Sequence, residues 1–446
     1  MKANHLILFG FLFLGITATE AQEKKSLTLD QAIHLAWEKS NEVNLANAKV
    51  TTKKYELQSV KNHRYPDLKA SAQYQRLTKA SIDLKNNGSE NEESGSDTKA
   101  PNVDQLVLGQ INASLPLFSG FKLQNSIKVS DNLYKAEAAN ALQTKEETAM
   151  EVINYYVALY KAQKTVELLK ENYKSAEQRV KDFTELEKNE IVPKNDLLKT
   201  QLQLSKVQLS LDQAKSDLNV VNYKLASLLK LDTNTQISVQ ESDLAAYELN
   251  NIPTDENPAL ENRKDLEALR FQEQASLESI KVARSGYYPS LSLIAGYTTL
   301  DLKNVVTVQN AMNFGIGLSY NISDIFKNGT EVKVAKSKAA EVQNSEMMLT
   351  DYIKNQVKKA LEDYDLSVKQ NSVYTQAVEQ ATENYRIIKD KYDNGLSDTN
   401  DLLEADVEQL SAKINKAVAK ANVIQKYYSL LAVTGQLNQT FNLSKI

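Results

Sequence analysis

The chain of 446 residues contains no cysteine, which excludes disulfides, thiolate metal ligands, cysteine nucleophiles and a lipid attached to an N-terminal cysteine. Its 13 glycines and 7 prolines are too few for the many loops of several globular domains. The formal net charge of −4 excludes a strongly basic nucleic-acid-binding protein. No phosphate-binding loop, nucleophile elbow or metalloprotease motif occurs, so the sequence predicts neither an enzyme, a cofactor nor a metal site.

The sequence also lacks an apolar run of the ~20 residues that a membrane-spanning helix needs. Its longest apolar run, LILFGFLFLG at 6–15, follows a short basic start and precedes Thr19-Glu20-Ala21. This order predicts a secretory signal peptide over residues 1–21, and the short run disfavours the alternative of a membrane anchor. The mature chain is then expected outside the cytoplasm, either in solution or crossing a membrane as β-strands.

The chain contains an internal duplication. Residues 64–74 read RYPDLKASAQY and resemble YYPSLSLIAGY at 287–297, and the sequence NDLL occurs at both 195–198 and 400–403. Both matches extend into neighbouring segments without a gap. Each half therefore contains a helix, two strands joined by a loop, a very long helix, a tight turn and another long helix.

The first repeat is predicted over 22–250 and the second over 251–435, followed by a C-terminal tail over 436–446. Their elements are helices over 28–63, 122–188, 194–231, 263–286, 330–394 and 397–434, and strands over 66–77, 106–118, 289–300 and 312–322. Thr28 followed by Gln31 predicts a capping box at the start of the first helix. A polar, acidic stretch over 78–104 is predicted to be an exposed loop.

The longest predicted helices reach ~100 Å at 1.5 Å per residue, a length typical of coiled-coil assemblies. Apolar residues recur at spacings of three and four in the last helix of each repeat, among them Val207, Leu211, Ala214, Leu410 and Ile414. This pattern indicates helices that contact neighbours on more than one side, as in a closed cylinder. A soluble two-helix coiled coil is the alternative.

The four predicted strands alternate apolar and polar residues, and each is about as long as a tilted membrane-spanning strand. The apolar positions are Leu68, Ala70, Ala72, Tyr74, Val107, Ile111, Ala113, Leu115, Leu117, Leu291, Leu293, Ala295, Tyr297, Phe314, Ile316, Leu318, Tyr320 and Ile322. Such alternation fits an outer-membrane barrel as well as half-buried hairpins of a soluble sandwich. The long flanking helices favour the barrel.

Four strands are too few to close a barrel, and every backbone group in lipid must be paired. Three copies would supply twelve strands. The predicted fold class is therefore α+β and mostly α, with a duplicated helix-strand-strand-long helix-helix unit. We expect a trimer that forms a 12-stranded transmembrane β-barrel on a long periplasmic α-helical barrel, which together make a conduit.

Several motifs resemble the TolC-like outer-membrane efflux protein family, also called outer membrane factors. They are LTLDQAIHLAW at 27–37, RYPDL and YYPSL at the strand starts, SLPLFSGF at 114–121 and YDNGLSDTNDLLEAD at 392–406. The resemblance covers nearly the whole mature chain, and the order of elements in the duplication is its most specific part.

The resemblance implies a homotrimer in the bacterial outer membrane, in contact with its lipid, with a large periplasmic portion. It implies the exit duct of a tripartite efflux or type I secretion system, docked to a periplasmic adaptor protein and an inner-membrane pump. It implies no enzymatic activity and no nucleic-acid partner. The alternatives are a periplasmic coiled-coil adaptor or structural protein without channel activity, and a barrel with a purely structural role.

In the family, the two turns between long helices meet the adaptor, and here these turns lie over 189–196 and 394–401. The resemblance therefore implies adaptor-docking residues at the tips, namely Ile191, Val192, Pro193, Gly395 and Leu396. Gly395 suits a left-handed turn and Pro193 suits a helix start. The alternative is that these residues only cover the helix ends.

The family also narrows its periplasmic entrance with acidic rings, and Asp401 and Glu404 occupy the matching positions. Three copies would place six carboxylates in a ring that attracts cations, repels anions and can bind divalent ions. The alternative is that both residues complement the helix dipole. Tyr392 and Asp196 match residues that hold the closed tip together, whereas Ser397 stands where some members carry a latch arginine.

Overall fold

The computed structural model describes residues 24–80, 103–239 and 255–441. The chain divides into two compact units, each assembled from three separate segments. We call the unit of residues up to 40, 148–252 and 362–429 the hairpin unit, and the unit of 41–147, 253–361 and 430 onward the sheet unit. The predicted signal peptide over 1–21 and most of the predicted loop over 78–104 lie outside the described residues.

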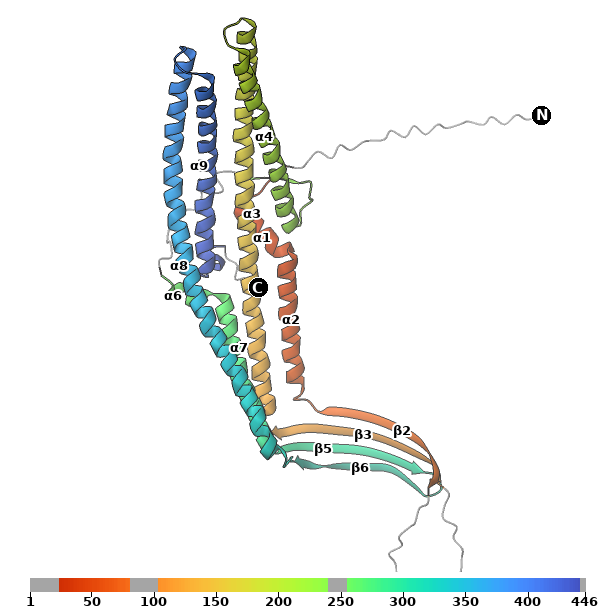
Figure 1. Cartoon of the computed structure of the whole chain (residues 1–446). Helices are drawn as coiled ribbons and strands as arrows, with labels where there is room; N and C mark the ends of the chain where they lie inside the picture. The colour runs from red at the N-terminus through yellow and green to blue at the C-terminus, as the bar shows by residue number, and fades with distance from the viewer. Residues whose placement is uncertain (1–23, 81–102, 240–254, 442–446) are drawn as a thin grey trace, which may run out of the picture. The chain divides into compact units, whose positions relative to one another are not determined.

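The hairpin unit contains two helical hairpins (Figure 1). One joins α3 (Lys122–Lys188) to α4 (Lys194–Leu228), and the other joins α8 (Asp324–Asp393) to α9 (Thr399–Val433). Helices α3, α8 and α9 continue into the sheet unit. Within the described residues, no helix is both long enough and apolar enough to cross a membrane.

The helices of the hairpin unit pack through the apolar positions that recur at spacings of three and four. Leu211 and Ala214 from α4 form a buried cluster with Leu169 from α3, and Leu410 and Ile414 from α9 pack against it. The repeating pattern of the last helix in each repeat therefore meets in one core. This cluster is one seam between the helices, and contacts on further sides of each helix stay a prediction.

A short parallel sheet completes the hairpin unit, with β1 (Lys24–Ser26) paired to β4 (Gln236–Ser238). It is followed by α1 (Leu29–Lys39), which begins with the predicted capping box. The Gln31 amide N–H donates to Thr28 Oγ1 at 3.2 Å, and the Thr28 N–H donates to Gln31 Oε1 at 3.1 Å. Two N–H groups that the helix start would otherwise leave unpaired are thus satisfied.

The prediction of one uninterrupted helix over 28–63 is wrong, because the chain is extended at Ser40, with φ −66° and ψ 146°. Helix α2 (Asn41–Asn62) starts directly after it. Serine is a favoured residue at helix starts because its side chain competes for backbone hydrogen bonds. The second repeat has the same interruption at Arg263, between α6 (Asn257–Asn262) and α7 (Lys264–Arg284).

The sheet unit is named for its four-stranded antiparallel sheet, ordered β2-β3-β5-β6 (Figure 1). The strands are β2 (Asp67–Ala80), β3 (Val103–Ser119), β5 (Ser290–Leu302) and β6 (Val306–Ser319). The one-turn 3-10 helix η1 (Ser285–Tyr287) precedes β5, and the short helix α10 (Leu437–Thr440) lies within the predicted C-terminal tail.

The strand register gathers most of the predicted apolar positions on one face of the sheet. Leu117 is an exception, because it lies in a bulge where Phe118 pairs with Leu291, and Tyr320 and Ile322 follow the end of β6. One row across the four strands reads Ala70, Ile111, Tyr297 and Met312, and the next reads Leu68, Ala113, Ala295 and Phe314. A row of the opposite face reads Lys69, Asn112, Gly296 and Asn313. Side chains alternate between the faces of a strand, so this register makes one face apolar and the other polar.

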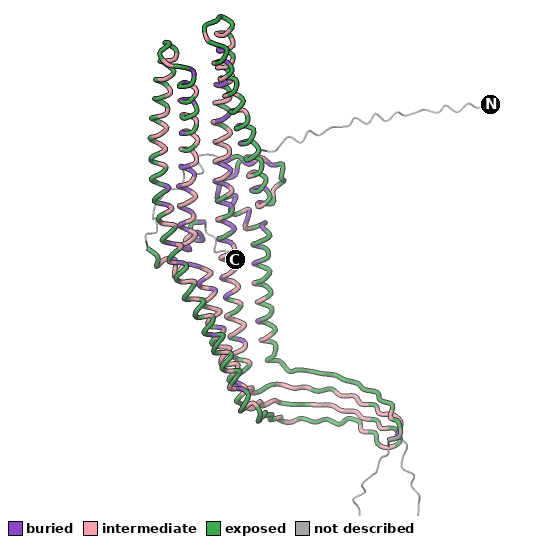
Figure 2. The backbone as a smooth tube through the Cα atoms, viewed as in Figure 1, coloured by how far each residue is buried: buried purple, intermediate pink, exposed green. Residues whose placement is uncertain are grey.

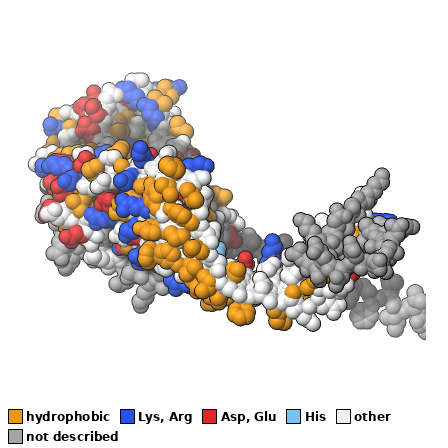
Figure 3. All heavy atoms as spheres, turned by 90° about the horizontal axis from the view of Figure 1, so that it is seen from below, with side chains coloured by type: hydrophobic (Ala, Val, Ile, Leu, Met, Phe, Trp, Pro, Cys, Tyr) orange, Lys and Arg blue, Asp and Glu red, His pale blue; other side chains and the backbone are white. Residues whose placement is uncertain are grey.

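The apolar face is exposed in the single chain. Phe314 is 91% exposed and Met312 78% exposed, and most described strand residues are exposed or half-buried (Figure 2). Figure 3, which views the molecule from below, shows hydrophobic side chains gathered in a patch on the face that it draws. Among the described residues no second sheet covers this face, as a soluble sandwich would require.

The turn between β5 and β6 is tighter than predicted. The strands were expected to end at 300 and restart at 312, but β5 extends to Leu302 and β6 begins at Val306. Asn304 adopts a left-handed conformation with φ 65°, which asparagine tolerates better than most residues. The Thr307 hydroxyl donates to Asp301 Oδ1 at 2.7 Å and links the two strands beside the turn.

Candidate functional site: the tips of the helical hairpins

The two helical hairpins end in the same type of backbone turn. Glu190, with φ 57°, and Gly395, with φ 75°, take the left-handed position at corresponding places in the repeats. The next residue then donates its N–H back into the helix, from Ile191 to the Leu186 carbonyl at 2.9 Å and from Leu396 to the Lys391 carbonyl at 2.8 Å. These bonds are those of a Schellman motif, which closes the C-terminal end of a helix.

The predicted docking residues lie on these turns and are largely exposed. Ile191 is 67% exposed and Leu396 is 78% exposed, Pro193 is exposed, and Val192 is half-buried. In a Schellman motif the residue after the turn often contacts an apolar residue one turn earlier. For Leu396 that residue is Lys391, so the leucine is left without an apolar partner in its own motif.

The predicted latch residues Tyr392 and Asp196 are linked through Thr399. The buried Thr399 hydroxyl donates to Asp196 Oδ2 at 2.9 Å. The ring of Tyr392 stacks on Phe183, with centroids 5.9 Å apart. Burial raises the pKa of Tyr392, and a hydrogen bond with Thr399 opposes that effect. Sequence reasoning missed Thr399, although it lies between two of the residues that were named.

A buried ion pair lies further along the same helices. Arg179 Nη1 is 3.1 Å from Asp406 Oδ2, with the two side chains 11% and 7% exposed. Asn172 also donates to this oxygen at 3.2 Å, and Arg179 Nη2 donates to the Tyr385 hydroxyl at 3.4 Å. Burial favours a neutral Arg179, but hydrogen bonding to Asp406 and its charge outweigh burial and raise the arginine pKa. No sequence spacing links Arg179 to Asp406, so this pair was not predicted.

Asp401 and Glu404 lie one turn apart in the first turns of α9, and both are exposed. The Ser397 hydroxyl donates to Asp401 Oδ2 at 2.8 Å. The start of α9 is capped by another residue, because Asp398 Oδ1 accepts the N–H groups of Asn400 and Asp401 at 2.8 and 3.0 Å. The carboxylates of Asp401 and Glu404 are therefore not needed as caps. Within the described residues of one chain, no group of three or more potential ligands is positioned to hold a metal ion.

The profile of the outer membrane efflux protein family matches residues 32–230 and 257–436, which are most of the chain and correspond to its two repeats. The chain belongs to the outer membrane efflux protein family. It is thus a protein of the bacterial outer membrane that acts in efflux.

Solved structures of outer-membrane channels share the fold of this family member. CmeC of Campylobacter jejuni is 18% identical with a TM-score of 0.74, and the match covers 98% of this chain and 94% of CmeC. VceC of Vibrio cholerae is 14% identical with a TM-score of 0.75, covering 91% of this chain and 96% of VceC. The open state of MtrE of Neisseria gonorrhoeae is 17% identical with a TM-score of 0.75, and the match covers 92% of this chain and 89% of MtrE. Comparison by sequence with curated proteins gives no match.

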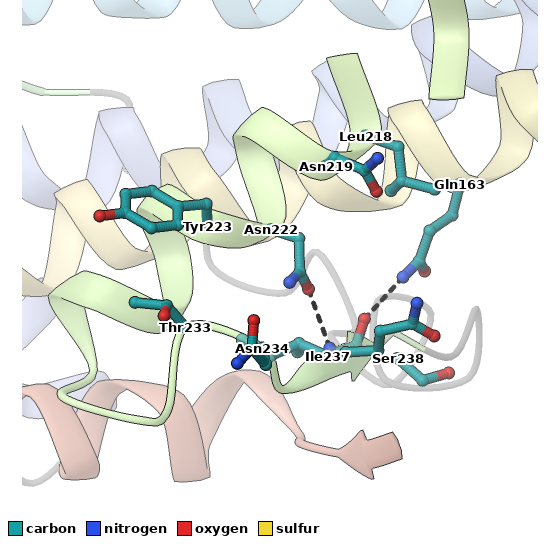
Figure 4. Close-up of a pocket in the computed structure, with 10 residues that line it drawn as sticks. Gln163, Leu218, Asn219, Asn222, Tyr223, Thr233, Asn234, Ile237 and Ser238 are labelled. Atoms are coloured by element: carbon teal, nitrogen blue, oxygen red, sulfur yellow. Dashed lines mark hydrogen bonds between the residues drawn. The ribbon is translucent and has the colours of Figure 1, made fainter. Parts of the chain in front are cut away.

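A polar cleft of about 460 Å³ lies in the hairpin unit of this efflux protein, beside β4 (Figure 4). Two of its amides bind the backbone of β4. Asn222 accepts the Ile237 N–H at 2.9 Å and donates to the Thr235 carbonyl at 2.8 Å, while Gln163 donates to the Ile237 carbonyl at 2.8 Å. These contacts replace strand hydrogen bonds and hold the short sheet against α3 and α4, so we assign the cleft a structural role.

Proposed function

We propose that three copies of the chain form an outer-membrane channel that serves as the exit duct of a tripartite efflux or type I secretion system. The exposed apolar face of the sheet supports this proposal most directly, because it has the residue pattern of a lipid-facing surface. Among the described residues, each of the outer strands β2 and β6 pairs with another strand on one side only. Pairing them between three copies would give a closed sheet of twelve strands.

The proposed duct is tested by conductance of the purified protein in a planar lipid bilayer. We expect discrete conductance steps from trimers that resist dissociation in mild detergent. A protein that forms trimers but never conducts would have a structural role instead, and a protein extracted from cells without detergent would be a periplasmic adaptor.

We propose that Asp401 and Glu404 form the acidic ring at the periplasmic entrance. Their exposure on one side of α9, and the capping of that helix by Asp398, support this role. The double variant Asp401→Asn/Glu404→Gln should lower cation selectivity and weaken block by divalent ions in single-channel recordings. Asp217→Asn removes an exposed carboxylate of α4 and serves as the control. Unchanged selectivity in the double variant would exclude the ring.

We propose that Ile191, Val192, Pro193, Gly395 and Leu396 dock the adaptor, which couples the channel to an inner-membrane pump. The exposed Leu396, which has no apolar partner within its turn, supports this role. Leu396→Asp should reduce export without reducing trimer abundance. The matched control is Asn400→Asp, which adds the same charge nearby and leaves the apolar surface intact. Equal export by the two variants would contradict docking at Leu396.

We propose that Tyr392 and Asp196, with Thr399 between them, hold the tip in its closed state. The hydrogen bond from Thr399 to Asp196 supports this role, and it supplies a contact near Ser397, where a family arginine is missing. Tyr392→Phe/Asp196→Asn should raise single-channel conductance, and conductance equal to that of the unmodified channel would exclude the latch.

A further inference from the structure

The junction between the strands and the helices carries exposed aromatic side chains. Their exposed fractions range from 39% to 84%, and they are Phe121, Tyr287, Tyr288, Tyr320 and Phe326. Aromatic residues gather where a membrane protein leaves the hydrocarbon core and enters the headgroup region. This junction is therefore at headgroup depth, a step that rests on the proposed membrane position of the sheet.

A cavity of about 500 Å³ opens at this junction. It is lined by the end of β3, the first residue of α3, the end of α7, η1, the start of β5 and the early part of α8. Its charged lining residues are one cation, Lys122, and one anion, Glu331, and both are exposed. Neither side chain forms a hydrogen bond or an ion pair with another described residue.

Asn328 adds a buried polar group to the lining. The residue is only 9% exposed, and its Nδ2 has no acceptor among the described residues. Gly286 leaves the space that this amide occupies, since a Cβ there would be 2.8 Å from Asn328 Oδ1. A buried donor without a partner is unfavourable. An acceptor from outside the chain would therefore stabilise the Asn328 side chain in this position.

We propose that this cavity binds the phosphoethanolamine headgroup of a membrane phospholipid. The phosphate is placed near Lys122 and the first turn of α3, where the helix start presents free N–H groups. The ammonium is placed near Glu331, and phosphate or ester oxygens near Asn328. The acyl chains would run along the exposed apolar residues nearby, Ile322, Ile325 and Phe326.

The charge of the lining selects among lipids. An anionic headgroup such as phosphatidylglycerol would satisfy Lys122 but leave Glu331 unpaired beside a negative charge. Inorganic phosphate lacks both the ammonium and the chains. The second repeat supplies Asn328 and Glu331, whereas the equivalent positions of the first repeat hold Leu123 and Ser126, so the corresponding place in the first repeat lacks these two polar groups.

The test is native mass spectrometry of the purified trimer with short-chain phosphatidylethanolamine, short-chain phosphatidylglycerol or inorganic phosphate. We expect phosphatidylethanolamine to bind at least tenfold more tightly than the other two. Lys122→Gln/Glu331→Gln should abolish this preference, and Lys333→Gln/Glu341→Gln, which changes exposed charges of α8 outside the cavity, should retain it.

Asn328→Leu, which introduces the residue of the first repeat, should weaken binding. If that variant does not assemble, the exposed Lys122 and Glu331 variants still decide the outcome.

Equal binding of the two lipids, or equal binding of inorganic phosphate, would overturn the headgroup assignment. Loss of trimers in Lys122→Gln/Glu331→Gln would also overturn it, because the cavity would then be an interface between copies. Bilayer conductance of the same samples tests the proposed channel separately.

Discussion

Ser40 in the first repeat and Arg263 in the second occupy equivalent positions, and each interrupts a helix with an extended backbone. Ser40 is completely buried, whereas Arg263, 8% exposed, forms a network of hydrogen bonds. The guanidinium binds both carboxylate oxygens of Asp265, at 3.0 and 2.5 Å, and donates to Gln356 Oε1 of α8 at 2.6 Å and to the Val433 carbonyl of α9 at 3.5 Å. The shared feature is the backbone conformation, and the side chains that stabilise it have diverged.

The sharpest difference between the repeats is expected from truncating these two residues. Arg263→Ala removes the partner of Asp265 and should cost about 3–5 kcal/mol of stability, as is usual when one member of a buried pair is lost. Ser40→Ala should cost only about 1 kcal/mol. Thermal unfolding in detergent measures both effects. Equal shifts of the unfolding midpoint would show that the hydrogen bonds of Arg263 do not stabilise the interruption between α6 and α7.

A second contrast involves Glu146 on α3 and its repeat equivalent on α8, the exposed Asp351. Glu146 is 4% exposed and accepts a hydrogen bond from Asn438 of α10. Burial raises the pKa of Glu146 to about 7, although the charges of Lys264 and Arg263 oppose that shift.

The sign of the pH effect follows from this raised pKa. Between the ordinary glutamate pKa of 4.5 and about 7, the folded protein keeps a proton that the unfolded chain has lost. Stability should therefore fall as the pH rises through this window, by about 3 kcal/mol at most, and stay level above it. Glu146→Gln should flatten this dependence between pH 5 and pH 8, and Asp351→Asn should leave it unchanged. The same slope in all three proteins would exclude Glu146 as its source.

The tips offer a third contrast, because Asp196 and Asp401 are repeat equivalents with different partners. Asp196 accepts from the buried Thr399, whereas Asp401 accepts from Ser397 on the surface. Thr399→Val should cost about 1–2 kcal/mol and speed hydrogen exchange in the first turns of α4 and α9. Ser397→Ala should have a smaller effect on the same amides. Equal exchange in the two variants would count against a special role for Thr399.

The smallest expected effect distinguishes the two turns themselves. Gly395→Ala should destabilise the protein by about 1 kcal/mol, since alanine disfavours a left-handed conformation even where no atom lies within 4 Å of the added Cβ. Glu190→Gly should leave stability unchanged or raise it by up to about 1 kcal/mol. The unfolding midpoint should thus fall in Gly395→Ala and stay level or rise in Glu190→Gly. A fall in both variants would show that the two turns differ in more than the residue at the left-handed position.

Local patterns in the sequence predicted much of the fold. Alternation along the strands predicted the apolar face, on which the register aligns Ala113, Ala295 and Phe314. Gly395 marked the turn of the second hairpin, because the turn requires a positive φ and glycine adopts it readily. Contacts between distant residues were missed, namely Arg179 with Asp406 and Thr399 with Asp196, because no spacing rule relates residues on different helices. The interruption at Ser40 was missed because its neighbours favour helix on both sides.

The outer backbone edges of β2 and β6 also affect how the chain can enter the membrane. A single sheet with two open edges is poorly suited to enter lipid, since its edge N–H and C=O groups would lose water without gaining partners. In the trimer proposed above, membrane insertion should therefore depend on the concentration of newly exported chains rather than on folding of each chain alone. The exposed apolar face would meanwhile need protection from aggregation, so this protein should rely on periplasmic chaperones more heavily than a barrel made from one chain.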